Sequence, residues 1–307
     1  MSAVGKPRVV LTGASGYLGR HVLHSLRQRG CDIVVLGRTL PLGFEDVTLI
    51  HTDLLDVASM EAAVKAVGVA KGTHLLHLAW YADYGKFWAS PLNFRWVEAS
   101  LRLVEAFCAQ GGKHVVMAGS CAEYDWADGY LREGATPFTP QTTYGVAKDA
   151  TRRLATALCA LHGATLAWGH IFFPFGPGEA PQRMIPSLMD VFQGHKAPFG
   201  VNASAYRGML YVPDAADAFA QLALTGTVGN FNICSGQPEK IEHVLRTLAR
   251  LCGADPEPVL KLASVRAGDP PMLVGQNTRL LATGWRPSFS LEQGLAAMVK
   301  DKLTAII

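Results

Sequence analysis

The chain has 307 residues, of which 49% are hydrophobic, and its formal net charge is +3. This length suffices for one large α/β unit or two unequal domains with a sizeable core. The weak charge and the lack of a basic cluster argue against nucleic acid as a partner. No run of about eighteen apolar residues predicts a membrane span, and residues 1–8 lack the apolar stretch of a signal peptide, so we expect a cytoplasmic protein. The six cysteines have no paired spacing, which predicts buried reduced thiols and no metal site.

A glycine-rich turn, Thr12–Gly19, follows a short apolar run and precedes a segment with helical spacing. Gly13 permits a tight turn, Gly16 lets a phosphate approach the backbone, and Gly19 allows the helix to pack on the strand. The free amides and the positive end of the helix dipole would then hold a pyrophosphate. This pattern predicts a dinucleotide site. We assign to it Gly13, Ser15, Gly16, Tyr17, Leu18 and Gly19.

Runs typical of strands then alternate with helical patterns. Alternation of this kind predicts an α/β fold with a doubly wound parallel sheet, the Rossmann arrangement. The predicted strands are Asp32–Gly37, Val47–Ile50, His74–Leu78, His114–Gly119 and Thr165–Ile171, and the predicted helices are Met60–Val67, Trp96–Ala109 and Tyr144–Leu161.

After Phe173 the pattern changes, because prolines interrupt the segments that follow. We assign residues 1–172 to a dinucleotide-binding domain. Residues 173–206 and 236–307 are expected to form a smaller, discontinuous substrate-binding lobe. Segments near 207–235 are expected to return to the first domain, with strands near Met209–Val212 and Asn230–Ile233 joining the main sheet.

The residue at the end of the second strand indicates the cofactor. Domains that bind NAD usually carry a carboxylate there, which accepts hydrogen bonds from the adenosine ribose. Here Arg38 takes that place, and a guanidinium binds a 2′-phosphate well. The sequence therefore favours NADP, with NAD as the alternative. Asp53 and Leu54 follow the third strand, where we expect them to meet the adenine.

Tyr144 and Lys148 are four residues apart at the start of a predicted helix, so their side chains share one face. We expect the ammonium of Lys148 to stabilise the phenolate and so to lower the pKa of Tyr144. Ser120 ends a predicted strand, at the edge of the sheet where ligands bind in doubly wound folds. Its hydroxyl is expected to hold a substrate carbonyl beside the tyrosine.

Together these motifs resemble the extended short-chain dehydrogenase/reductase family of the NAD-dependent epimerase/dehydratase type, whose members mostly modify nucleotide sugars. The resemblance covers almost the whole chain. Its other motifs are His77-Leu78-Ala79, Gly119–Tyr124, Tyr144–Lys148, Phe175–Glu179, Arg207 with Leu210–Val212, and Arg266–Asp269. It implies that Tyr144 is the acid/base, that Lys148 also binds the nicotinamide ribose, and that Ser120 orients the substrate oxygen. Ala79 would line the cofactor site.

The resemblance also implies how a nucleotide sugar is held. Arg207 and Arg266 would neutralise the substrate diphosphate, for which arginine offers a fork of donors. Asp269 would bond the nucleoside ribose, and Phe199 would lie against the base. Family members often pair through two long helices, so we expect a homodimer.

Several positions depart from the family pattern. Sugar 4,6-dehydratases carry Asp-Glu directly after the Ser/Thr, where this chain has Cys121-Ala122, so we do not expect dehydration. Trp96 and Phe173 stand where the family often has asparagine, and His170 replaces a common arginine. An aromatic segment follows the fourth strand and either lines a sugar pocket or forms a packed loop. It contains Trp80, Tyr81, Tyr84, Phe87 and Trp88.

Three functions are compatible with these residues. The first is an NADP(H)-dependent ketoreductase of a nucleotide-linked keto sugar, foremost a 4-keto-6-deoxyhexose, with Tyr144 as proton donor. The second is a nucleotide-sugar 4-epimerase that uses bound NAD, which Arg38 disfavours. The third is a non-catalytic dinucleotide sensor, which the presence of Tyr144 and Lys148 disfavours, because sensors of this fold generally lack both.

Overall fold

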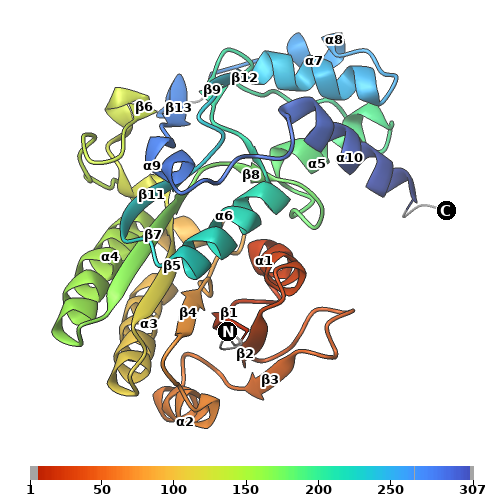
Figure 1. Ribbon diagram of the computed structural model, residues 1–307. Coiled ribbons are helices and arrows are strands. Elements are labelled where there is room, and N and C mark those ends of the chain that lie inside the picture. Colours follow the sequence, from red (N-terminus) through yellow and green to blue (C-terminus); the bar gives the residue numbers. More distant parts are fainter. Residues whose placement is uncertain (1–5, 266, 305–307) are drawn as a thin grey trace.

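The computed structural model describes residues 6–265 and 267–304 (Figure 1). Its centre is a seven-stranded parallel sheet in the order β11-β7-β5-β4-β1-β2-β3. The strands are β1 (Arg8–Thr12), β2 (Asp32–Gly37), β3 (Thr48–His51), β4 (Thr73–His77), β5 (His114–Ser120), β7 (Thr165–Ile171) and β11 (Gly229–Ile233). The order changes direction between β1 and β4, and ligands of such sheets bind beyond the carboxyl ends of the strands at that point. The predicted doubly wound fold is confirmed.

Helices cover both faces of this sheet (Figure 1). Helices α1 (Tyr17–Gln28) and α6 (Val212–Thr225) pack together on one face, and α2 (Val57–Val67), α3 (Leu92–Ala109) and α4 (Thr143–Leu161) cover the other. Side chains alternate along each strand, so Val9 and Leu11 enter one buried core and Val10 enters the other. Continuous apolar runs are therefore needed, because both faces are buried.

A smaller lobe with its own apolar core lies beyond the carboxyl ends of the strands (Figure 1). Its helices are α5 (Met184–Phe192), α7 (Ile241–Leu251), α8 (Glu257–Leu260) and α10 (Leu291–Thr304), while α9 (Thr278–Ala282) contacts β11. A four-stranded sheet has the order β12 (Glu239–Lys240), β9 (Tyr206–Arg207), β13 (Met272–Gly275) and β6 (Tyr130–Leu131). Thus β6, from the first half of the chain, pairs with the C-terminal part, and the domain division at residue 172 stays a prediction.

One predicted strand lies outside the main sheet. β11 joins the main sheet beside β7, as expected for Asn230–Ile233, but β10 (Leu210–Tyr211) pairs with β8 (Pro174–Phe175) in a separate two-stranded sheet. The prediction that Met209–Val212 joins the main sheet is therefore wrong. The edge beside β7 is taken by β11, and the chain turns into α6 directly after Tyr211, with a proline in the first turn of that helix.

Short 3₁₀ turns connect these elements near the carboxyl edge of the sheet. They are η1 (Phe87–Ala89), η2 (Cys121–Glu123) and η3 (Trp126–Asp128). Among the helices of the described part of the chain, none has both the length and the apolar composition to cross a membrane. All six cysteines are free thiols, and four of them are buried.

Candidate active site

The glycine-rich turn joins β1 to α1 at the point where the strand order reverses. Gly13 has a φ of 75°, and a Cβ on it would lie 2.7 Å from the backbone nitrogen of Ala79. A Cβ on Gly19 would lie 1.9 Å from the carbonyl oxygen of Gly13. No side chain caps the first turn of α1, so its amides are open to an anion. The turn therefore has the shape and the donors that a pyrophosphate needs.

The residues expected at the adenosine end lie at one edge of the sheet, because β2 and β3 are neighbours. Arg38 is exposed directly after β2, and no hydrogen bond or ion pair with the rest of the described chain holds its guanidinium. Asp53 accepts a hydrogen bond from the backbone nitrogen of Leu55 at 3.0 Å. Leu54 is buried against the core. Arg38 is thus free to pair with a phosphate.

The structure brings Ser120, Tyr144 and Lys148 together. Ser120 is the last residue of β5, and the other two lie in the first turns of α4, which Thr142 caps by accepting a bond from Gly145. The Ser120 side chain faces the Tyr144 phenol and lowers the pKa of that phenol. The ammonium nitrogen of Lys148 lies 5.9 Å from the centroid of the Tyr144 ring. A substrate oxygen near the phenol would therefore also lie near the serine hydroxyl.

The protonation of this group differs from the sequence expectation. Burial raises the pKa of Tyr144, and the hydrogen bond with Ser120 offsets only part of that increase. Burial also lowers the pKa of Lys148 to about 7. Its ammonium donates to the carbonyl oxygen of Ala118 at 2.8 Å and lies 3.8 Å from the ring centroid of Trp80. The predicted lowering of the Tyr144 pKa is therefore wrong: the phenol is protonated at neutral pH.

The aromatic segment both packs as a loop and walls the reaction site. The rings of Trp80, Phe87 and Trp88 contact Tyr144 edge-on, with centroids 6.5, 4.8 and 5.7 Å from its own. Trp96, which stands in place of a family asparagine, stacks on Trp80 at 6.2 Å. The candidate reaction site thus has an aromatic, apolar wall on this side.

Asn93 holds this segment, and the sequence analysis missed it. Its side chain accepts a hydrogen bond from the Trp80 indole at 2.9 Å and donates to the carbonyl oxygens of Phe87 at 2.7 Å and Ser90 at 3.0 Å. It is fully buried. The available signal was a polar residue at the start of a helix directly after an aromatic-rich loop, which is too common a pattern to indicate a role.

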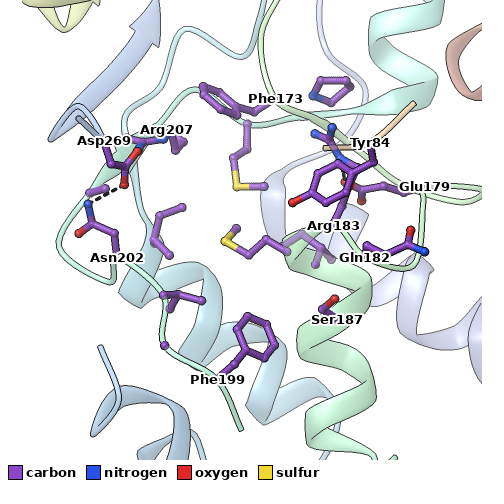
Figure 2. A pocket seen from close by; sticks show the side chains of 18 of the residues that line it. Tyr84, Phe173, Glu179, Gln182, Arg183, Ser187, Phe199, Asn202, Arg207 and Asp269 are labelled. Carbon is purple, nitrogen blue, oxygen red and sulfur yellow. Dashed lines mark hydrogen bonds and ion pairs between the residues drawn. The ribbon is translucent and has the colours of Figure 1, made fainter. Parts of the chain in front are cut away.

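A pocket of about 660 Å³ opens in the lobe (Figure 2). On one wall Arg207 pairs with Asp269 at 2.6 Å, and Asn202 donates to the same carboxylate at 2.8 Å. Figure 2 shows Arg183 and Glu179 on the opposite wall, and this pair is 2.7 Å apart. The predicted substrate residues Phe199, Arg207 and Asp269 therefore line one pocket.

The pocket reaches toward the aromatic segment, because Tyr84 also lines it. Phe173, at the position where the family often has asparagine, lies beneath the Arg207 guanidinium, 5.5 Å from ring centroid to guanidinium carbon. Arg266 lies outside the described residues. Within residues 6–265 and 267–304, no group of three or more His, Cys, Asp or Glu side chains is arranged to hold a metal ion.

Comparison with known proteins finds relatives along nearly the whole chain. A UDP-glucose 4-epimerase of Streptomyces lividans is 25% identical over 92% of this chain and 92% of that protein. A GDP-6-deoxy-D-mannose reductase of Pseudomonas aeruginosa is 25% identical over 96% of both chains. The solved structure of MoeE5 in complex with UDP-glucuronic acid and NAD is 26% identical, with a TM-score of 0.81 over 98% of this chain and 100% of that one.

The family model described as NAD dependent epimerase/dehydratase family matches residues 9–234, which is well over half of the chain. This match includes the glycine-rich turn, Ser120, Tyr144 and Lys148. The resemblance inferred from the sequence motifs is confirmed. The chain therefore belongs to the NAD dependent epimerase/dehydratase family.

Proposed function

We propose that the protein is an NADP(H)-dependent ketoreductase that acts on a nucleotide-linked keto sugar, foremost a 4-keto-6-deoxyhexose. The observation that carries this proposal is the Tyr144 phenol, which faces the Ser120 side chain and whose raised pKa favours the protonated form. A protonated phenol is ready to give a proton to a carbonyl oxygen. An epimerase begins by oxidising an alcohol, for which the same group must start as a phenolate.

The chain's own residues supply the rest of the chemistry. A bound nicotinamide cofactor supplies the hydride. Ser120 and Tyr144 hold the carbonyl oxygen by two hydrogen bonds, which strengthen as negative charge develops there. Tyr144 transfers its proton to that oxygen, so the carbonyl becomes an alcohol. The Lys148 ammonium stabilises the phenolate that remains, since opposite charges attract strongly in a buried site.

Two further observations support the cofactor and the substrate class. The exposed guanidinium of Arg38, which no other described residue binds, suits the 2′-phosphate of NADP. The aromatic wall of Trp80, Phe87 and Trp88 suits a sugar whose C6 is a methyl group. The GDP-6-deoxy-D-mannose reductase of Pseudomonas aeruginosa is similar over almost the whole chain.

A nucleotide-sugar 4-epimerase with bound NAD is the second candidate. The similarity to the Streptomyces lividans UDP-glucose 4-epimerase favours it, since it is as strong as that to the reductase. The three reacting side chains suit either reaction, because both pass a hydride and a proton at one carbon. The cofactor preference and the resting protonation of Tyr144 favour the reductase.

One pair of reactions separates the candidates. Purified protein is incubated with NADPH and a nucleotide-linked 4-keto-6-deoxyhexose, and separately with UDP-glucose and no added cofactor. The proposal predicts stoichiometric loss of nicotinamide absorbance in the first reaction and no change in the second. Interconversion of UDP-glucose and UDP-galactose without added cofactor would show the epimerase. No conversion in either reaction, together with tight NADPH binding, would contradict both the reductase and the epimerase. That result would favour a non-catalytic dinucleotide sensor.

A further inference from the structure

Glu123 is a completely buried carboxylate in the turn that follows Ser120. A carboxylate in such a place is costly unless hydrogen bonds and a cation compensate for the lost water. One oxygen, Oε1, accepts a hydrogen bond from the backbone nitrogen of Ser120 at 2.6 Å. The indole nitrogen of Trp168 donates to Oε1 at 3.2 Å and to Oε2 at 3.0 Å. The carboxylate therefore fixes the backbone of Ser120 directly.

The same carboxylate faces the helix that carries the other two reacting groups. The Nε atom of Arg152 lies 3.6 Å from Oε2 of Glu123, and Arg152 also pairs with Asp149 at 2.5 Å. Tyr144, Lys148 and Arg152 follow one another at intervals of four residues, so they share one face of α4. Glu123 thus links the turn that carries Ser120 to the reacting face of α4.

The backbone is shaped to allow this link. A Cβ on Gly119 would lie 2.0 Å from the Trp168 indole nitrogen and 2.5 Å from Oε1 of Glu123. A Cβ on Gly145, in the first turn of α4, would lie 2.3 Å from the carbonyl oxygen of Ala122. Glycine at both positions lets the turn pack directly on the helix. The Ser120 hydroxyl also accepts a bond from the Ala122 backbone nitrogen at 3.2 Å.

Other titratable groups surround the carboxylate. His170 of β7 lies 3.4 Å from Oε1 through its Nδ1 atom, with its ring beside Tyr124. Cys121 lies in the same turn, and Arg152 and Asp149 approach from α4. The charge of Glu123 raises the pKa of both Tyr144 and Lys148. Removing that charge should therefore move both pKa values to lower pH.

We propose that Glu123 is a positioning residue for the reaction: through the Ser120 backbone and Arg152 it holds the serine hydroxyl beside the Tyr144 phenol. This inference rests on the proposed function, because it assigns Glu123 a task in that chemistry. The carboxylate has no exposed surface and both its oxygens are bonded, so it does not itself touch substrate. Glu123 acts through Ser120. It does not take the place of the Asp-Glu pair that sugar 4,6-dehydratases carry directly after the Ser/Thr.

The hydrogen bond to Ser120 can be observed alone, because Gly119-Ser120 is the single Gly-Ser pair in the 307-residue sequence. Protein labelled with carbonyl ¹³C in glycine and ¹⁵N in serine gives one carbonyl-selected amide signal. A short bond to a charged acceptor predicts a strongly downfield, slowly exchanging Ser120 amide proton. This wild-type signal tests the bond even where a variant does not fold.

Glu123→Gln keeps a neutral acceptor for the Ser120 amide and removes the charge. We expect the Ser120 signal to move upfield and kcat to fall roughly tenfold to a hundredfold, since small displacements of reacting groups are costly. The NADPH dissociation constant should stay within about twofold, because no cofactor contact is lost. The limb of the pH profile that belongs to Lys148 should move to lower pH.

Glu133→Gln is the matched control. Glu133 also accepts a short bond from a backbone amide, that of Asn232 at 2.7 Å, but it lies in the turn after β6. The Glu133→Gln variant should have a Ser120 amide signal and a kcat close to those of the wild type. An unmoved Ser120 signal in Glu123→Gln, or an equal loss of kcat in the two variants, would overturn the positioning role.

The two proposals fail in different ways. A wild-type protein that reduces no keto sugar, but whose Ser120 amide responds to Glu123→Gln, would contradict the proposed function and leave the link to Ser120 standing. An active wild-type protein whose Ser120 amide is not downfield and does not respond would contradict the role of Glu123 alone.

Discussion

At the candidate reaction site, the phenol of Tyr144 faces the Ser120 side chain and packs against aromatic rings. Tyr144→Phe removes the hydroxyl and keeps the ring that packs against Phe87. We expect kcat to fall by roughly a hundredfold or more, because the proton donor is lost. The dissociation constant of NADPH, measured by fluorescence titration, should be nearly unchanged. Turnover within a few-fold of wild type would remove Tyr144 from the mechanism.

From the pKa of Lys148 we predict that kcat/KM depends on pH close to neutrality. Its pKa is lowered to about 7, so its ammonium is present below that pH and is lost as the pH rises through it. Because the ammonium stabilises the phenolate formed in the reaction, kcat/KM should fall on the alkaline side of about pH 7. Lys148→Arg, which stays charged, should move this fall to higher pH. A rate that is constant across neutrality in the wild type would contradict this assignment.

From Arg38 we predict that the protein prefers NADPH to NADH. Arg38→Ala should weaken NADPH binding about tenfold or more and change NADH binding little, because only the 2′-phosphate is lost as a partner. The matched control is Arg8→Ala. Arg8 starts β1, at the amino ends of the strands and away from the glycine-rich turn, and it pairs there with Asp32. Equal losses for the two cofactors in titrations of Arg38→Ala would cancel the preference for NADP.

At this scale the sequence predicted which candidate residues lie together but not their surroundings. Ser120, Tyr144 and Lys148 stand in motifs with fixed spacing, so their meeting could be inferred. Glu123 contacts Trp168 and Arg152, which are distant in sequence, and no local pattern indicates such partners. Asn93 bonds residues of the loop just before it, but a buried asparagine at a helix start is too common a pattern to predict this. The pKa of Tyr144 could not be predicted either, because the burial that raises it depends on the folded chain around the ring.

Among the elements, the segment between β4 and α3 makes three hydrogen bonds with one buried side chain, that of Asn93. Asn93→Ala removes three buried hydrogen bonds and should cost about 2–4 kcal/mol in the free energy of unfolding. We also expect KM for the sugar to rise, because Trp80 and Phe87 lose their anchor. Denaturant unfolding and steady-state kinetics measure the two effects.

Ser90→Ala is the control within the same loop. Ser90 accepts one bond from the Leu92 backbone nitrogen at 3.3 Å, so its loss should cost at most about 1 kcal/mol. If Asn93→Ala were as stable and as active as Ser90→Ala, the aromatic segment would not depend on Asn93.

The main elements of the sheet were predictable because a strand buried on both faces needs a continuous apolar run. Helix starts were less certain: α3 begins at Leu92, before the predicted Trp96, directly after Pro91. The position of Met209–Val212 could not be inferred. A two-residue strand carries no pattern that distinguishes the main sheet from a side pairing with β8.

At the scale of the whole molecule, the glycine-rich turn belongs to the main sheet, and the smaller lobe lies beyond the carboxyl ends of its strands (Figure 1). The pocket is lined mostly by residues of that lobe. α3 and α4 pack side by side. Two apolar side chains on this helix pair are exposed in the single chain: Phe94 on α3 is 62% exposed and Leu154 on α4 is 51% exposed. A second copy of the chain would cover them in a dimer. The homodimer expected from the family resemblance stays a prediction, which light scattering would check.

The central claim is that this arrangement passes a hydride from NADPH to a sugar carbonyl, with Tyr144 as the proton donor. The most direct test incubates the protein with NADPH deuterated at C4 of the nicotinamide, on either face, and a nucleotide-linked 4-keto-6-deoxyhexose. Proton and deuterium NMR of the product then locates the label. We predict deuterium at sugar C4 from one of the two cofactors, in amounts equal to the NADPH consumed. Deuterium that stays in the cofactor, with an unchanged keto sugar, would contradict the account.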